Sequence, residues 1–276
     1  MKNHLYYIFV VLLITPDIAV SAEQEAANKN SFYFNPTVID SKNGTGSTVG
    51  AEFKFNGELL SRNFESSETG DVFDPNVAIG STVIGYSGNG TVAASKDRNP
   101  KNFLEFLLDA KLKYSDPSNG SIMGGFFSKY ETNQSFSSKQ IVYGLGTTYG
   151  KKAAISPNDF FALDIAYGRV DPTADLARQT ALGTTTLNPY YRLNLELLFM
   201  YPVKSNNVSS VEFNYRYFLE NNAPAAIKNT GLDKHQLSTL LLRLKNDMFV
   251  AYSAGKLPFD RKNDQIFQIG YSYKLN

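Results

Sequence analysis

Residues 266–275 read I-F-Q-I-G-Y-S-Y-K-L and form the most regular alternating stretch of the chain. From Phe267 onward the odd-numbered side chains are Phe, Ile, Tyr, Tyr and Leu, while the even-numbered ones are Gln, Gly, Ser and Lys. Successive side chains of a β-strand point to opposite faces, so this period of two predicts a strand with one apolar face. A strand that ends a chain must still pair along both edges, which favours a sheet closed on itself. The stretch therefore predicts a β-barrel.

The N-terminal residues 1–22 have the features of a secretory signal peptide. Lys2 supplies a positive charge, residues 6–14 are an uninterrupted apolar run, and V-S-A at 20–22 resembles a signal-peptidase site. The apolar run is too short to span a bilayer as a helix, which disfavours the alternative of an uncleaved anchor. We predict a signal peptide over 1–22, a short polar leader over 23–30 and one domain over 31–276.

The composition narrows the class of protein. The 27 basic and 26 acidic residues nearly cancel, which gives no support to nucleic-acid binding. The chain has no cysteine, so an exported domain must be stabilised by backbone pairing and packing instead of disulfides. Aromatic residues make up 13% of the chain and are all Tyr or Phe, which suits β-strands.

Alternating segments recur along the rest of the chain and predict about twelve strands. Residues 104–114 and 122–130 are a clear pair, because the D-P-S-N-G sequence at 116–120 favours a tight turn between them. The S-G-N-G sequence at 87–90 predicts another turn or the start of a loop. Residues 61–76 are acidic and lack a period, and residues 175–182 could form a short helix in a long connection. Strands in this order predict an antiparallel up-and-down meander.

A set of charged side chains lies on the polar faces of the predicted strands. Its members are Glu52, Lys54, Glu105, Asp109, Lys111, Asp164, Arg192, Glu196, Glu212, Arg216, Arg243 and Lys245. Inside a barrel, neighbouring charges of opposite sign could offset the cost of leaving water. On the exterior of a soluble protein they would simply be solvated. We predict that they line a lumen, with a soluble periplasmic β-protein as the alternative.

The predicted connections differ in length between the two ends of the sheet. Counting back from a periplasmic C-terminus, the long loops 171–188 and 221–234 lie outside the cell. The short turns near Asp116, Ser205 and Asn246 then lie in the periplasm, an arrangement typical of transmembrane barrels. Residues 61–76 are an exception, because they form a long connection on the side of the short turns.

With its signal peptide, alternating strands and aromatic-rich final strand, the chain resembles the outer-membrane β-barrel proteins of Gram-negative bacteria. The resemblance is to the class and covers residues 31–276. It implies a closed antiparallel transmembrane β-barrel in the cell outer membrane, in contact with outer-membrane lipid. It also implies assembly by the barrel-assembly machinery, which reads the C-terminal strand. Members of the class usually end on an aromatic residue, whereas this chain ends Y-K-L-N.

Candidate catalytic and metal-binding residues are few. His235 is the sole histidine after the predicted signal peptide, and Ser238 three residues later would lie on the opposite face of a strand. That spacing does not support a nucleophile and base pair, and we expect His235 to be solvated at a loop edge. Glu68, Asp71 and Asp74 do not match the spacing of an EF-hand. We predict no enzyme activity, no metal and no cofactor.

The function must then come from the lumen or the loops. A barrel of twelve strands is intermediate in size between small barrels, which side chains fill, and porins, which hold a wide channel. Gly144, Gly146 and Gly150 would leave one wall thin, so the charged side chains could line a narrow polar path or lock together as a plug. We predict a porin-like transport channel for passive diffusion of small hydrophilic solutes, with weak ion preference. The alternative is a surface interaction barrel, an adhesin or receptor, whose long loops bind a partner.

Overall fold

The structure, a computed structural model, describes residues 30–42, 47–64, 79–95, 99, 101–116, 120–260 and 263–275. The predicted signal peptide lies outside the described residues, and so do residues 23–29 of the predicted leader and the acidic residues of 65–76. Asn30, which we assigned to the leader, begins the first strand instead.

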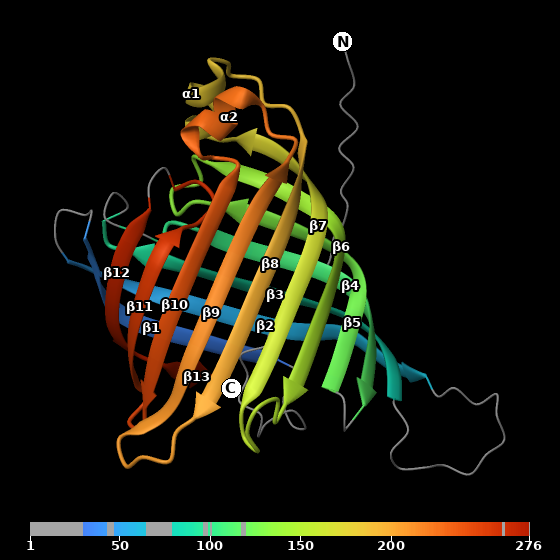
Figure 1. Ribbon diagram of the computed structural model, residues 1–276, viewed down its shortest axis with the longest axis vertical. Helices are drawn as coiled ribbons and strands as arrows, with labels where there is room; N and C mark the ends of the chain where they lie inside the picture. The colour runs from blue at the N-terminus through green and yellow to red at the C-terminus, as the bar shows by residue number, and fades with distance from the viewer. Residues whose placement is uncertain are drawn as a thin grey trace.

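Most of the described chain is in β-strands (Figure 1). They are β1 (Asn30–Ser41), β2 (Thr48–Phe64), β3 (Ile79–Ala93), β4 (Leu104–Asp116), β5 (Gly120–Thr132), β6 (Lys139–Lys152), β7 (Phe160–Ala174), β8 (Tyr190–Pro202), β9 (Val208–Asn221), β10 (Lys234–Leu244), β11 (Met248–Lys256), β12 (Asp264–Tyr271) and β13 (Tyr273–Leu275). Two short helices, α1 (Leu176–Leu182) and α2 (Ala225–Thr230), lie together over one end of the sheet, which we call the cap end (Figure 1).

Each strand pairs antiparallel with the next, and β12 and β13 both pair with β1, which closes the sheet. β12 and β13 keep one register on β1, shown by the pairs Thr37 with Gly270 and Phe34 with Tyr273. Their pairing is interrupted opposite Asn35 and Pro36, because proline has no amide hydrogen to donate. The two segments therefore act as one strand. The predicted all-β fold, a closed antiparallel barrel of twelve strands in up-and-down order, is confirmed.

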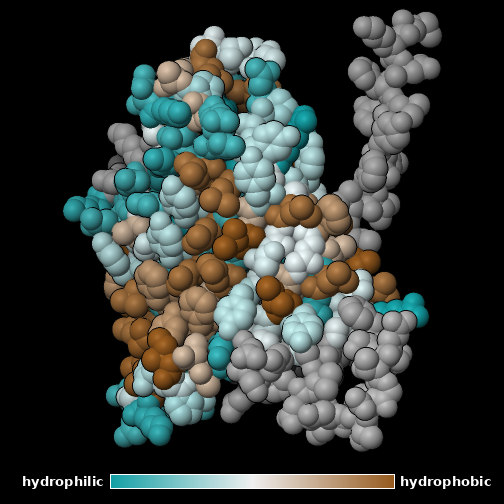
Figure 2. Space-filling view, turned by 45° about the vertical axis from the view of Figure 1, so that its right-hand side comes forward, coloured by the Kyte–Doolittle hydropathy of each residue, from teal (hydrophilic) through white to brown (hydrophobic). Residues whose placement is uncertain are grey.

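The apolar faces of the strands form the outside of the barrel. Phe126 is 71% exposed, Leu112 60% and Leu145 57%, whereas charged side chains of the opposite parity are buried inside. Figure 2 shows apolar surface across the middle of the face in view, with polar surface above it and at its lower left. Such a band is what a bilayer requires of a transmembrane barrel. Among the described residues, no helix is both long enough and apolar enough to cross a membrane.

The turn predicted at 87–90 is wrong, because β3 continues through these residues. Gly88 lacks a side chain to pack on the sheet, and aromatic rings from both neighbouring strands cover it. A Cβ atom there would lie 2.6 Å from the Phe55 ring and 2.9 Å from the Phe106 ring. Packing by Phe55 and Phe106 thus supplies the side-chain contacts that stabilise this part of β3, which its own glycines cannot provide.

The aperiodic segment predicted at 61–76 begins inside a strand. β2 extends to Phe64, and its register on β3 shifts between Glu58 and Leu60. Such a bulge disrupts the alternation of faces, and Leu59 and Leu60 are both about half exposed. The bulge explains why the alternation in the first part of β2 does not continue into residues 61–64.

The helix predicted at 175–182 is confirmed as α1. The Asp175 side chain caps it by accepting a hydrogen bond from the Arg178 amide, and Gly183 ends it in the left-handed region. α2 was not predicted from the sequence. It ends in the same way at Gly231, whose φ is 66°.

A charged side chain on the outer band should destabilise the barrel in lipid. We predict that Leu145→Arg on β6 costs about 2–4 kcal/mol of unfolding free energy if its site lies near the bilayer midplane. Denaturant titration of the protein folded into phospholipid vesicles measures this cost.

The matched control is Phe136→Arg, since Phe136 is 53% exposed in the loop beyond β5 and outside the strands. It should change the unfolding free energy little. Equal effects of the two substitutions would contradict a lipid-facing band.

Candidate functional site: the barrel lumen

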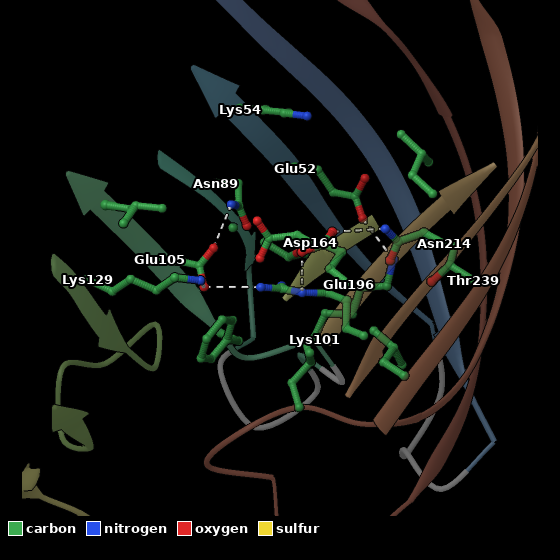
Figure 3. A pocket seen from close by; sticks show the side chains of 18 of the residues that line it. Glu52, Lys54, Asn89, Lys101, Glu105, Lys129, Asp164, Glu196, Asn214 and Thr239 are labelled. Carbon is green, nitrogen blue, oxygen red and sulfur yellow. Dashed lines mark hydrogen bonds and ion pairs between the residues drawn. The ribbon is translucent and has the colours of Figure 1, made fainter. Parts of the chain in front are cut away.

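A cavity of about 320 Å³, lined by both charged and apolar side chains, occupies the barrel interior (Figure 3). Six acidic and six basic side chains line it: Glu52, Glu105, Asp109, Asp164, Glu196 and Glu212, with Lys54, Lys101, Lys111, Lys129, Arg216 and Arg243. All of them except Lys101 come from strands, namely β2, β4, β5 and β7 to β10, whose polar parity faces inward. The lining is therefore electrically balanced.

Ten of the twelve predicted lumen residues line this cavity: Glu52, Lys54, Glu105, Asp109, Lys111, Asp164, Glu196, Glu212, Arg216 and Arg243. Arg192 is also inside the barrel, 3% exposed, but lies closer to the cap end. Lys245 does not line the lumen. It is exposed in the turn between β10 and β11, because β10 ends at Leu244.

Two lining lysines were missed from the sequence. Lys101 belongs to the segment before β4, where alternation gives no guidance. Lys129 lies on β5, whose inward parity also carries Phe127 and Met123, so that both faces of this strand look apolar. The charge at Glu131 on the same parity is the signal that could have identified Lys129 as inward-facing.

An ion pair crosses the middle of the lumen. Arg216 on β9 donates from Nη2 to Oε2 of Glu105 on β4 over 3.1 Å, and these strands are five places apart in the closed order. Glu105 also accepts from Nζ of Lys129 at 3.0 Å and from Nδ2 of Asn89 at 3.2 Å (Figure 3). Arg216 Nε lies 3.3 Å from Oε2 of Glu196. We call Glu105, Lys129, Glu196 and Arg216 the central network. Because their side chains meet across the interior, the central network narrows the lumen.

Further ion pairs line the cavity around the central network. Lys101 Nζ lies 3.0 Å from Oε1 of Glu52, which also accepts from Nε2 of Gln268 at 3.0 Å. Other pairs are Lys111 with Asp109 and Arg243 with Glu212. Burying a charge is costly unless a partner compensates it, so these contacts hold the lining side chains in place.

Two arginines fasten the cap end. Arg192 makes two hydrogen bonds to Glu131, of 2.9 and 2.5 Å, inside the barrel. Arg178 of α1 makes two to Glu220 of β9, of 2.6 and 2.7 Å, and its guanidinium lies 4.1 Å from the Tyr190 ring centre. Burial disfavours the charged form of Arg178, but the hydrogen bonds that it donates to Glu220 outweigh this and raise its pKa. α1 is thus tied to the inner wall.

Two apolar clusters lie inside the barrel as well. The inner cluster is Leu107, Phe127, Val142, Ala166 and Val170, with Tyr190 packed against it. The cap-side cluster is Phe103, Phe218, Leu237 and Leu257, with Phe259 packed against it. Gly146, one of the glycines expected to leave a thin wall, lines the cavity. The Phe127 ring occupies part of the space beside it, because a Cβ on Gly146 would lie 3.6 Å from this ring and one on Gly168 of β7 would lie 3.0 Å from it.

The loop that carries Leu257 and Phe259 is closed by Asp260. The Leu257 amide donates to Oδ2 of Asp260 over 2.9 Å, and the Asp260 amide donates to the Leu257 carbonyl over 3.1 Å. Burial raises the pKa of the Asp260 carboxyl to about 7. This carboxyl group therefore fixes the position of Leu257 at the edge of the cap-side cluster.

His235 lies within β10 and not at a solvated loop edge, so that expectation is wrong. It pairs with Phe218 and its Nε2 is buried in the barrel near α1. Ser238 has the opposite parity, so the two side chains do not share a face, as their spacing predicts. In the described part of the chain, no group of three or more His, Cys, Asp or Glu side chains could hold a metal ion.

A closed barrel with charges inside and apolar residues outside decides the class of fold. The chain has the fold of an outer-membrane β-barrel. No protein-family model matches the chain, and no curated protein matches it.

Solved structures of outer-membrane barrels are similar to the chain at low identity. A NanC porin is 10% identical with a TM-score of 0.45, covering 88% of this chain and 100% of that one. OmpT, an outer-membrane protein of Vibrio cholerae, is 9% identical with a TM-score of 0.41, covering 89% and 99%. The translocator domain of the autotransporter NalP from Neisseria meningitidis is 10% identical with a TM-score of 0.30, covering 91% and 90%. Likenesses this distant transfer no site residue to this chain.

The tie between α1 and the wall predicts a specific weakness. Arg178→Ala leaves Glu220 buried without its partner, a change that typically costs about 3–5 kcal/mol. We expect α1 to open and residues 175–188 to become faster to cleave in limited proteolysis of the folded barrel.

Arg169→Ala is the matched control, because Arg169 also pairs with an acid, Asp171, but on the exposed outer surface. An exposed pair contributes little. If both variants are cleaved at the wild-type rate, the pair does not hold α1 in place.

Proposed function

We propose that the protein is a narrow porin-like channel of the outer membrane for passive diffusion of small hydrophilic solutes. The observation that carries the proposal is the balanced, charged cavity inside a barrel whose exterior is apolar. Neither feature is needed by a soluble protein, which would place its charges outside.

The exterior supports the membrane part of the proposal. In hydrocarbon every backbone N–H and C=O must be paired within the protein, and a closed barrel achieves this. The pairing of β1 with β12 and β13 provides that closure. In the proposed orientation the cap end faces the outside of the cell. The turn between β10 and β11 and the end of the C-terminal strand face the periplasm. The predicted signal peptide supports export to this location.

The lining supports the solute class. Six acidic and six basic side chains cancel, so the cavity favours neither cations nor anions strongly. The central network crosses the lumen, so a passing solute must be small or must displace Arg216 from Glu105. A narrow, weakly selective path for small polar molecules fits both features.

The cap favours a second function. α1 and α2 cover one end of the lumen, and Leu176 at the start of α1 is 59% exposed. A barrel closed in this way could serve as a scaffold whose outer loops bind a partner. Recording of electric current across a bilayer distinguishes the two functions, because a channel must conduct and a binding scaffold need not.

Planar-bilayer recording of the purified, folded protein tests the channel. We predict discrete current steps above background for the wild type and a larger step for Arg216→Ala, because that substitution removes the side chain that spans the lumen. Arg169→Ala, which alters an arginine on the outer surface, should leave the step size unchanged.

Folded wild type and folded Arg216→Ala that both pass no current would contradict the channel. The loop-binding scaffold would then be the function to pursue.

A further inference from the structure

The cap-side cluster separates two spaces inside the barrel. The large cavity reaches Phe103, Leu237 and Leu257, where its lining ends toward the cap. On the other side, a space of about 20 Å³ is lined by Phe218 and Phe259 together with residues of α1. A solute that crosses the barrel must therefore pass this cluster.

Charged layers lie on both sides of the cluster. On the inward face of β9 the order is Arg216, Phe218 and Glu220, so an aromatic ring stands between two charges. Arg216 lies 5.3 Å from the Phe218 ring centre on the cavity side, and Arg192 lies 4.9 Å from it on the cap side. The cap-side cluster is thus an apolar layer with a charged side chain on each side of it along the barrel.

The cluster spans the lumen from wall to wall. Phe103 precedes β4, and its ring lies 6.3 Å from that of Phe218 on β9 and 6.1 Å from that of Phe259. The Arg216 guanidinium also lies 5.5 Å from the Phe103 ring centre. This cation–π contact holds the Phe103 ring toward β9, across the lumen from β4. Phe103 is 2% exposed, so water has little access to the contact.

Two kinds of segment supply the cluster. Phe218 and Leu237 belong to the paired strands β9 and β10, whereas Leu257 and Phe259 belong to the loop after β11. Phe259 has a φ of 73°, a left-handed conformation that is strained for an aromatic residue. The surrounding packing must hold this strain, so the loop half of the cluster, unlike the strand half, depends on side-chain packing alone.

We propose that Phe103, Phe218, Leu237 and Leu257 form a hydrophobic gate that, while closed, excludes water and hydrated ions from the cap end of the lumen and conducts only when it opens. The inference rests on the proposed channel and names the residues that control it. An apolar constriction blocks conduction by dewetting, since a hydrated ion would have to shed water without gaining polar partners. Polarity, and not size alone, then sets the barrier to conduction.

A near-isosteric polar substitution separates a hydrophobic gate from a simple steric plug. Leu237→Asn keeps roughly the volume of the side chain and lets water enter the cluster. We expect a several-fold higher mean current in planar bilayers, or a higher fraction of time open. Leu176→Asn is the matched control, because it makes the same substitution on α1, at a side chain that is 59% exposed and lines neither space inside the barrel. It should conduct as the wild type does.

Phe103→Ala provides an independent arm, because it removes the ring that crosses the lumen. Heat-modifiable migration on gels checks that each variant is folded before recording. A larger current for Phe103→Ala and Leu237→Asn, but not Leu176→Asn, supports the gate. Current that rises for Phe103→Ala while Leu237→Asn matches Leu176→Asn would overturn it in favour of a steric plug. Silence of the wild type and of all three folded variants would reject the channel itself.

Discussion

Charges enclosed in a narrow barrel are stable only when partners of opposite sign compensate them, and this constraint organises the interior. The outer faces of the strands carry mainly apolar residues. The charged side chains on the opposite parity therefore point into the barrel. Glu105 illustrates the result, since it is 1% exposed and accepts from Lys129, Asn89 and Arg216, which come from three different strands. Such contacts connect the walls of the barrel as well as neutralising its lining.

The same constraint links structure to function. Pairs such as Arg216 with Glu105 narrow the lumen, so any conduction must be selective for size. The apolar cap-side cluster lies beyond them and adds a barrier of a different kind, which depends on hydration. α1, held by Arg178 on Glu220, covers the cap end. A layered interior of this type explains how a barrel of twelve strands could be permeable without being widely open.

Much of the fold was predictable because β-strand alternation is a local signal. The period of two at 266–275 and its recurrence identified the barrel, and parity alone placed Glu105, Asp164 and Arg216 on inward faces. Failures occurred where long-range packing overrides local sequence. The Phe55 and Phe106 rings, from two other strands, cover Gly88 and keep residues 87–90 in β3. The cap-side cluster was not foreseen, because Phe103 and Leu257 lie outside strands and meet Phe218 only in three dimensions.

The most direct test of the account asks which parity faces lipid. The chain has no cysteine, so single cysteines can be placed at each position from 162 to 167 of β7, spin-labelled and studied in phospholipid bilayers. The account predicts that the labels at 163, 165 and 167 are highly accessible to lipid-dissolved oxygen and that those at 162, 164 and 166 are not. Uniform accessibility, or the opposite alternation, would contradict a membrane-spanning barrel with a charged lumen.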